Sequence, residues 1–255
     1  MTQNDLFLQW LSEEQAAYIH GWDFSHIQDR YEECQSLPWD YGQAVHDLLR
    51  PTHRILDMDT GGGEFLLSLG HPHSLTAATE GYPPNIALCR KVLLPLGIDF
   101  RGADGGGPLP FPDESFDLVL NRHGDYLPSE ILRVLKPGGI FLTQQVGAEN
   151  DRDLVELLLN PAPPLPFPEQ YLDIARKKLE FLGLRILEAQ ESFQPIRFWD
   201  TGALVWFARI ISWEFPGFSV EACREQLLNA QALLERDGVI QGTAHRYFLV
   251  AEKVE

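Results

Sequence analysis

The chain has 255 residues, of which 44% are hydrophobic and 22% are charged. This composition argues against intrinsic disorder and suits one sizeable α/β core with an added cap. The net charge of −17 argues against a nucleic-acid partner, because such partners are bound through excess lysine and arginine. No stretch reaches the ~20 apolar residues of a membrane helix, so we expect no membrane partner.

The three cysteines, Cys34, Cys89 and Cys223, are far apart in the sequence and odd in number. We interpret them as reduced and mostly buried thiols, not as a disulfide framework. His71 and His73 flank a proline, but no further ligands stand at metal spacing, so a surface turn and no metal is expected there. The first residues also lack an export signal, and the sequence therefore predicts a cytoplasmic protein.

Residues 1–50 look helical and aromatic, and from residue 51 strand and helix signals alternate. Helices are expected in EFLLSLG, in PPNIALCRKVLLPLG, which Gly97 ends, and in PSEILRVL, which KPGG closes. Five short apolar runs are expected to be strands: 53–58, 74–80, 98–104, 116–121 and 139–146. Strict alternation of this kind predicts a parallel sheet covered by helices.

Two helices around a proline-rich loop, PAPPLPFPEQ, are predicted within residues 148–183. Further strands are expected at 184–193 and 245–253, with helical material between them that ends at Gly238. The predicted fold is therefore α/β, with a doubly wound, seven-stranded, mainly parallel sheet and an antiparallel last strand.

Ligands of open parallel sheets bind at the carboxyl ends of the strands. Four motifs stand at such ends: DMDTGGG at 57–63, Glu80, Ala103-Asp104, and Asn121-Arg122-His123. The glycines allow a sharp turn and a close approach to a ligand. The Glu80 carboxylate can accept two hydrogen bonds from a ribose diol, and Asp104 can accept one from a purine amino group.

LDMDTGGGEFL, TEGYPPNIALC, GAD, LPFPDESFDLVLNRH and ILRVLKPGGIFL occur in this order. Together they resemble the Rossmann-like, class I S-adenosylmethionine-dependent methyltransferases, in particular the small-molecule and ubiquinone-type subgroup. The resemblance covers residues 50–147 strongly and the remainder loosely. It implies a helical lid at 1–50 and a methyltransferase domain at 51–255, with a helical cap inserted at about 195–238.

The resemblance also implies roles for particular residues. Asp57, Gly61 and Gly63 would receive the amino acid end of the cofactor, and Glu80 would hold its ribose. Ala103 and Asp104 would meet the adenine, and Asn121 would lie beside the methionine portion.

Asp59 departs from the family pattern, because it stands where the first glycine of the loop is usual. Aspartate tolerates a positive φ better than most residues, so the turn can survive. Its carboxylate would attract the cofactor's cationic groups and repel its carboxylate. Our hypothesis is that Asp59 weakens cofactor binding without abolishing it.

The spacing between the glycines and Glu80 also fits a nicotinamide site. The dinucleotide fingerprint, however, needs a third glycine three residues after Gly63, where this chain has Leu66. The motifs therefore favour methyl transfer to an oxygen or nitrogen of an unidentified small molecule. Two alternatives stay open: a non-catalytic protein that binds S-adenosylmethionine or S-adenosylhomocysteine, and an RNA methyltransferase.

His123 is the candidate catalytic base, because it follows the fourth strand, and a structural histidine is the competing interpretation. Aromatic residues before the first strand and at the start of the insertion could line the acceptor pocket. We single out Tyr31, Trp39 and Asp200 as candidates for the lid or the substrate site.

Overall fold

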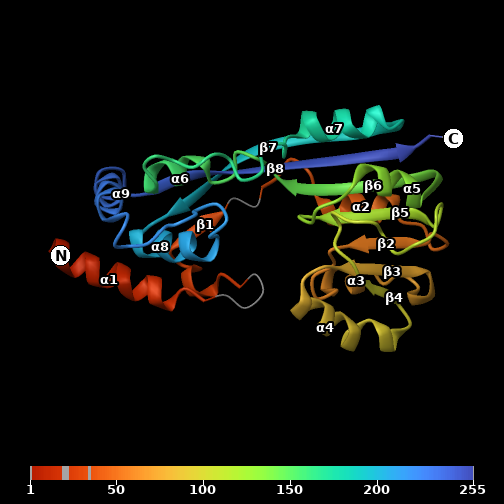
Figure 1. Ribbon diagram of the computed structural model, residues 1–255, viewed down its shortest axis with the longest axis horizontal. Helices are drawn as coiled ribbons and strands as arrows, with labels where there is room; N and C mark the ends of the chain where they lie inside the picture. Colours follow the sequence, from red (N-terminus) through yellow and green to blue (C-terminus); the bar gives the residue numbers. More distant parts are fainter. Residues whose placement is uncertain (1, 19–22, 34–35, 255) are drawn as a thin grey trace. The chain divides into compact units, whose positions relative to one another are not determined.

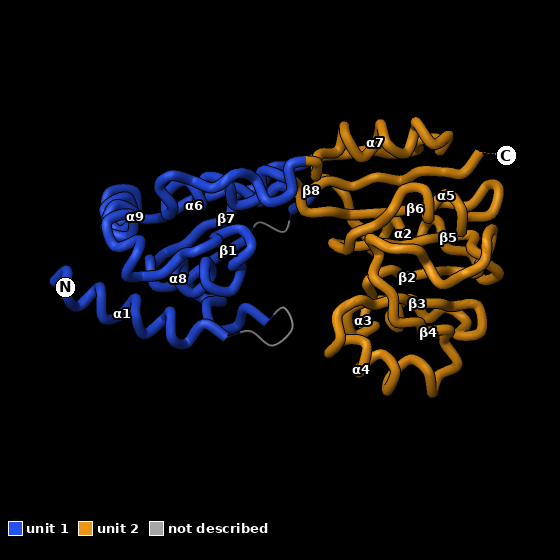
Figure 2. The backbone as a smooth tube through the Cα atoms, in the orientation of Figure 1, with its two compact units in different colours: residues 1–37, 148–168, 192–245 blue, residues 38–147, 169–191, 246–255 orange. Residues whose placement is uncertain are grey.

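The computed structural model describes residues 2–18, 23–33 and 36–254. The chain forms two compact units, each assembled from separate segments (Figure 2). Unit 1 comprises residues 1–37, 148–168 and 192–245, and unit 2 comprises residues 38–147, 169–191 and 246–255. The lid and cap boundaries expected from the sequence stay a prediction.

The sheet of unit 2 is the framework expected from the alternating motifs (Figure 1). Its first five strands are β2 (Ile55–Met58), β3 (Thr76–Glu80), β4 (Asp99–Gly102), β5 (Phe116–Arg122) and β6 (Leu135–Val146). β2 pairs in parallel with β3 and β5, β3 with β4, and β5 with β6. β8 (Ile240–Lys253) pairs antiparallel with β6, as predicted for the last strand.

The strand order is β1-β7-β8-β6-β5-β2-β3-β4, so the described residues form a sheet of eight strands and not seven. The additional strand is β1 (Tyr31–Glu33), which pairs antiparallel with the last residues of β7 (Leu184–Phe198). Three residues are too short to show a period-2 pattern, and this is why the sequence did not reveal β1. β7 and β8 are also longer than predicted, since each runs on into unit 1.

Helices cover both faces of the unit 2 sheet. The helices of this unit are α2 (Tyr41–Leu48), α3 (Glu64–Ser68), α4 (Pro83–Val92), α5 (Pro128–Val134) and α7 (Leu172–Phe181), with short 3₁₀ turns at 73–75 and 94–96. One apolar cluster joins α2, α3 and α4 to Ile55 and Leu120, and another joins α5 and α7 to Leu56 and Val119. Successive strand residues thus face opposite clusters, as in a doubly wound sheet.

The KPGG motif lies inside β6, whereas the sequence predicted only the end of a helix there. Leu135 pairs with Phe116 and Ile140 pairs with Leu118, so the four residues between them stand opposite Asp117 alone. Gly138 takes a φ of 74°, which suits glycine. The motif is therefore a bulge that lets the strand start before the turn.

Unit 1 contains α1 (Gln3–Ala16), α6 (Arg152–Leu158), α8 (Thr201–Ile210), α9 (Arg224–Asp237) and the 3₁₀ turn Ser25–Ile27. Its core is aromatic, with Trp10 and Trp206 both 1% exposed. α9 ends at Gly238, which has a φ of 76°, as predicted. In the described part of the chain, no helix is both long and apolar enough to span a bilayer.

Candidate functional site

The turn after β2 is built around a buried carboxylate. Thr60 Oγ1 donates a 2.6 Å hydrogen bond to Asp57, and burial raises the pKa of Asp57 to about 6. Asp59, Gly61 and Gly63 take positive φ values of 52°, 65° and 87°. A side chain at Gly63 would also lie 2.8 Å from Leu93, so glycine is needed there for both conformation and space.

Glu80, at the end of β3, ties the neighbouring loops together. Its Oε2 accepts a 2.8 Å hydrogen bond from the Gly61 amide, and its Oε1 accepts one of 2.8 Å from the Tyr82 amide. Asn85 Nδ2 donates to Oε2 at 3.4 Å. Glu80 is 5% exposed, and its carboxylate is therefore fixed beside the glycine turn.

Ala103 and Asp104 follow β4 and lie against the end of β3. The Ala103 amide donates to the Glu80 carbonyl at 3.0 Å. A Cβ placed on Gly81 would be 3.2 Å from Asp104 Cα, so the two loops pack backbone to backbone. Asp104 Oδ1 accepts from the Gly106 amide, which holds this side chain at the start of its loop.

Asp59 occupies the space between two other loops of the site. Its Oδ2 would lie 2.8 Å from a Cβ on Gly105 and 2.3 Å from a Cβ on Gly124, so both positions need glycine. Burial, followed by the charges of Glu80, Asp104, Asp125 and Asp57, raises the pKa of Asp59 to about 7. The departure from the family pattern thus places a carboxylate of shifted pKa in the middle of the site.

Asn121 is buried at the end of β5, where it pairs with Met58 of β2. Its Oδ1 accepts hydrogen bonds from Thr143 Oγ1 at 3.0 Å and from Gln145 Nε2 at 2.5 Å. Its Nδ2 has no hydrogen-bond partner among the described residues. Gln145 Nε2 also donates to the Gly124 carbonyl, which anchors the loop that follows β5.

His123 begins that loop with a φ of 63°, and its amide donates to the Gln144 carbonyl. Gln144 Nε2 lies 3.1 Å from His123 Nε2, and Gln144 Oε1 accepts from Trp39 Nε1 at 2.8 Å. Burial, followed by the charges of Arg246 and Arg122, lowers the pKa of His123. The lowered pKa keeps the imidazole neutral near pH 7 and makes it a weak proton acceptor.

The structure thus gathers most of the predicted cofactor residues at the carboxyl edge of one sheet. Two of the candidate lid residues, Tyr31 and Asp200, lie in unit 1. Tyr31 contacts the rings of Phe24, Phe198 and Phe207. Asp200 caps α8, because its side chain accepts a hydrogen bond from the Ala203 amide. A role for Tyr31, Trp39 or Asp200 in acceptor binding stays a prediction. Cys89 and Cys223 are buried free thiols, and Cys34 lies outside the described residues.

Two further residues lie on the same face of the sheet as Asp57, and the sequence motifs assigned a role to neither of them. Arg122 places its guanidinium over the rings of Tyr41 and Phe65, at 5.5 and 5.1 Å from their centroids. The Tyr41 hydroxyl is buried without a partner among the described residues. The strand alternation of Leu120 and Arg122 could have indicated that Arg122 shares a face with Asp57.

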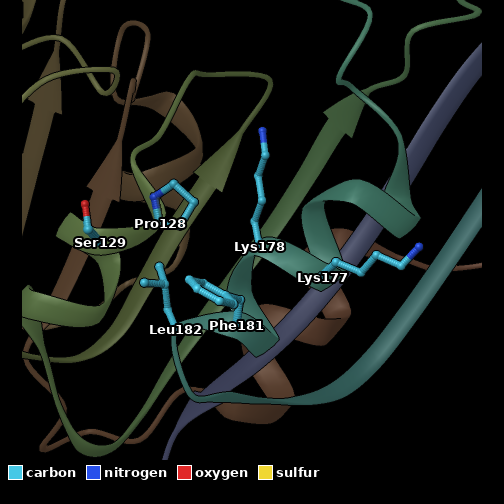
Figure 3. Close-up of a pocket in the computed structure, with 6 residues that line it drawn as sticks. All are labelled: Pro128, Ser129, Lys177, Lys178, Phe181 and Leu182. Atoms are coloured by element: carbon cyan, nitrogen blue, oxygen red, sulfur yellow. The ribbon is translucent and has the colours of Figure 1, made fainter.

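An open cavity of about 510 Å³ lies between α5 and α7, away from these residues. Figure 3 shows Pro128, Phe181 and Leu182 close together, while the ammonium groups of Lys177 and Lys178 extend away from them. None of the residues that line this cavity belongs to the candidate site. Within residues 2–18, 23–33 and 36–254, no three His, Cys, Asp or Glu side chains are grouped as metal ligands.

Residues 56–143 match a family model described as a methyltransferase domain. A phthiotriol/phenolphthiotriol dimycocerosates methyltransferase of Mycobacterium tuberculosis is 39% identical over 88 residues, which is 32% of each chain. A demethylmenaquinone methyltransferase of Deinococcus radiodurans is 32% identical over 111 residues, or 40% of this chain and 46% of the relative. The match therefore spans about a third to a half of these relatives.

One solved structure, of a functionally unknown Deinococcus radiodurans protein, has a TM-score of 0.60 at 17% identity. The superposition covers 96% of this chain and 97% of the other. At this identity the similarity concerns the fold alone, and it extends well beyond the segment matched in sequence.

Proposed function

Residues 56–143 form a methyltransferase domain of the class I, Rossmann-like family that uses S-adenosylmethionine, and from this premise we propose a function for the whole protein. The protein transfers the methyl group of S-adenosylmethionine to an oxygen or nitrogen of a small molecule. The relatives support a small acceptor, since they are named for phthiotriol derivatives and for demethylmenaquinone.

The observation that carries the proposal is the 2.8 Å hydrogen bond from the Gly61 amide to Glu80. It joins the turn after β2 to the end of β3, at the edge where open α/β sheets bind nucleotides. Glu80 would hold the ribose diol, and Ala103 and Asp104 would meet the adenine. Asp57, Gly61 and Gly63 would receive the amino acid end, with Asn121 beside the methionine portion.

The site fits such a cofactor in a second respect. Asn121 Nδ2 and Thr79 Oγ1 are buried polar atoms with no partner among the described residues, and both belong to strand ends of the site. Buried polar atoms without partners are rare, because burying them without a hydrogen bond costs free energy. A ligand that hydrogen-bonds to them would remove this cost. Asp59 opposes this fit, because it occupies space between the surrounding loops.

The cofactor supplies a methyl group bonded to a sulfonium, which is already a good leaving group. The chain must then align the acceptor and, for a hydroxyl, accept its proton. His123 stays the candidate acceptor of that proton, with a pKa that burial lowers. Gln144 holds the His123 ring and is itself held by Trp39, so the imidazole is oriented before the acceptor arrives.

A turnover assay tests this function. Purified protein is incubated with S-adenosylmethionine and a panel of phenols, quinols and amines, and S-adenosylhomocysteine is measured. We expect product with at least one acceptor class and a loss of product in Glu80→Gln. His123→Asn, which tolerates the positive φ, should lower kcat about 100-fold and leave cofactor affinity unchanged.

A non-catalytic binding protein is the second candidate, and the position of Asp59 favours it. Wild-type protein that binds S-adenosylhomocysteine yet forms none with any acceptor would support that candidate over the enzyme. An RNA substrate stays the alternative that the net charge argues against, and assay of the purified protein with RNA tests it. A cytoplasmic location stays a prediction, which fractionation of the source cells tests.

A further inference from the structure

Arg122 shares one face of the sheet with Asp57. Asp57 pairs with Leu120 across β2 and β5, and side chains alternate along a strand, so Arg122 lies one step beyond Leu120 on the same face. Ile55, Leu118 and Leu120 of this face pack against α2 and α3. Arg122 thus continues an apolar row and ends it with a cation at the carboxyl edge.

The guanidinium of Arg122 is stacked on two aromatic rings. It lies over the rings of Tyr41 and Phe65, and no hydrogen bond or ion pair joins it to another described residue. A guanidinium that stacks by its face keeps the N–H groups at its edge free to donate. These groups match the two oxygens of a carboxylate.

The Tyr41 hydroxyl is a second hydrogen-bond donor, on one of the two rings that the Arg122 guanidinium covers. Tyr41 is 6% exposed, and its oxygen is one of the buried atoms without a partner in the described chain. Burial, followed by the charge of Asp57, raises the pKa of this hydroxyl, and the charge of Arg122 acts in the opposite direction. An anion held between the guanidinium and the phenol would give the hydroxyl the partner that it lacks.

Asp57 supplies the opposite charge beside these donors. Its carboxylate accepts from Thr60 on one oxygen and is influenced by the positive charge of Arg122. A guanidinium stacked on a phenol ring, with a carboxylate on the same face of the sheet, suits a zwitterion, which carries a carboxylate and an ammonium on a single carbon. The amino acid end of S-adenosylmethionine is such a group.

We propose that Arg122 and the Tyr41 hydroxyl bind the α-carboxylate of the cofactor's amino acid end, while Asp57 receives its α-ammonium group. This inference rests on the proposed function and adds to it the residues that select an adenosyl compound with an amino acid end. It predicts that the site separates S-adenosylhomocysteine from 5′-methylthioadenosine, a thioether that has the same adenosine and lacks the amino acid.

Calorimetric titration with these two compounds tests the inference. The wild-type protein should bind S-adenosylhomocysteine at least about 30-fold more tightly than 5′-methylthioadenosine. Arg122→Gln should weaken binding of S-adenosylhomocysteine about 30-fold and leave that of 5′-methylthioadenosine within about 2-fold. Tyr41→Phe removes only the hydroxyl and should act in the same direction, by about 5-fold.

Arg224→Gln is the matched control. The Arg224 guanidinium lies 4.5 Å from the Phe7 centroid in unit 1, so it is another arginine stacked on a phenyl ring. This variant should bind both compounds as the wild type does. Retained binding of 5′-methylthioadenosine by Arg122→Gln shows that the variant is folded.

Two results would overturn the inference and leave the proposed function standing: equal weakening of both compounds in Arg122→Gln, or no change in either. Wild-type protein that binds neither compound would overturn the proposed function, and this inference with it.

Discussion

The aromatic core of unit 1 and the carboxyl edge of unit 2 differ in how their buried polar groups are hydrogen-bonded. In unit 1 the buried tryptophans are satisfied: Trp10 Nε1 donates to Thr201 Oγ1 at 2.8 Å, and Trp206 Nε1 donates to the Ala16 carbonyl at 3.3 Å. At the carboxyl edge of unit 2, Tyr41 and Asn121 bury polar atoms that have no hydrogen-bond partner among the described residues.

The same edge of unit 2 also concentrates strain and charge. Asp59 and His123 take positive φ values, and the pKa values of Asp57 and Asp59 are raised. Each of these features costs folding free energy, and such costs cluster where a protein binds or reacts. The aromatic core of unit 1 is therefore packed for stability, whereas the carboxyl edge of unit 2 is suited to bind a ligand. Four substitutions test this difference.

The largest expected effect is in the core of unit 1. Trp206→Ala should lower the free energy of unfolding by about 3–5 kcal/mol, because it removes a fully buried indole and leaves a cavity. Trp199, which is 45% exposed, is the matched control, and Trp199→Ala should cost less than about 1 kcal/mol. Urea unfolding measures both, and equal losses would contradict the assignment of Trp206 to a packed core.

Asp59→Asn should have the next largest effect on the free energy of unfolding, and it should have this effect only above acidic pH. The pKa of Asp59 is raised from 3.8 to about 7, so the folded state holds its proton more tightly than the unfolded chain does. Stability therefore falls as pH rises from about 4 to 7, and Asp59→Asn removes this loss.

Relative to wild type, Asp59→Asn should gain about 2–4 kcal/mol at pH 8 and almost nothing at pH 4. Urea unfolding of both proteins across this range gives the difference, and parallel curves would contradict the account. The same position tests the cofactor hypothesis, since Asp59→Gly should bind S-adenosylhomocysteine more tightly than wild type.

Gly63→Ala should cost about 2 kcal/mol, because it combines a positive φ with a contact of 2.8 Å to Leu93. Gly70 is the control, since its φ is 62° and a Cβ added there would have no atom within 4 Å. Gly70→Ala should cost about 1 kcal/mol, for strain alone. Thermal unfolding compares the two, and an equal cost would show that the Leu93 contact relaxes freely.

Tyr41→Phe should have the smallest effect and the opposite sign. Removing a buried hydroxyl without a partner should stabilise the ligand-free protein by about 1 kcal/mol. Tyr126, whose hydroxyl hydrogen-bonds with that of Tyr247, is the contrast, and Tyr126→Phe should destabilise by about 1 kcal/mol. If Tyr41→Phe also destabilises, its hydroxyl has a partner and the contrast between the units weakens.

Periodicity and turn chemistry were enough to predict the parallel strands of unit 2, since their apolar runs end at glycine and proline signals. The glycines of the turn after β2, and Gly238 at the end of α9, were also predictable, because such turns and helix ends need the positive φ values that glycine adopts readily. β1 escaped prediction because its pairing is non-local and three residues long. The KPGG bulge escaped because a glycine turn looks the same inside a strand as before one.

The site was predictable only where a residue contributes to a recognisable motif. The contact of Asp59 with Gly105 and Gly124 depends on three loops far apart in sequence, which no local pattern encodes. The same applies to Arg122, whose stacking on Tyr41 and Phe65 joins three separate elements. Charge and burial at these positions follow from tertiary structure alone.

Binding of S-adenosylhomocysteine to purified protein tests the central claim most directly. Calorimetry should give one site per chain, and Glu80→Gln should weaken binding at least about 10-fold, because an amide cannot accept from both the Gly61 and Tyr82 amides and a ribose diol. Glu188→Gln, which changes an exposed glutamate of unit 2, should bind as the wild type does. Absence of binding by the wild type, or equal affinity in Glu80→Gln, would contradict the account.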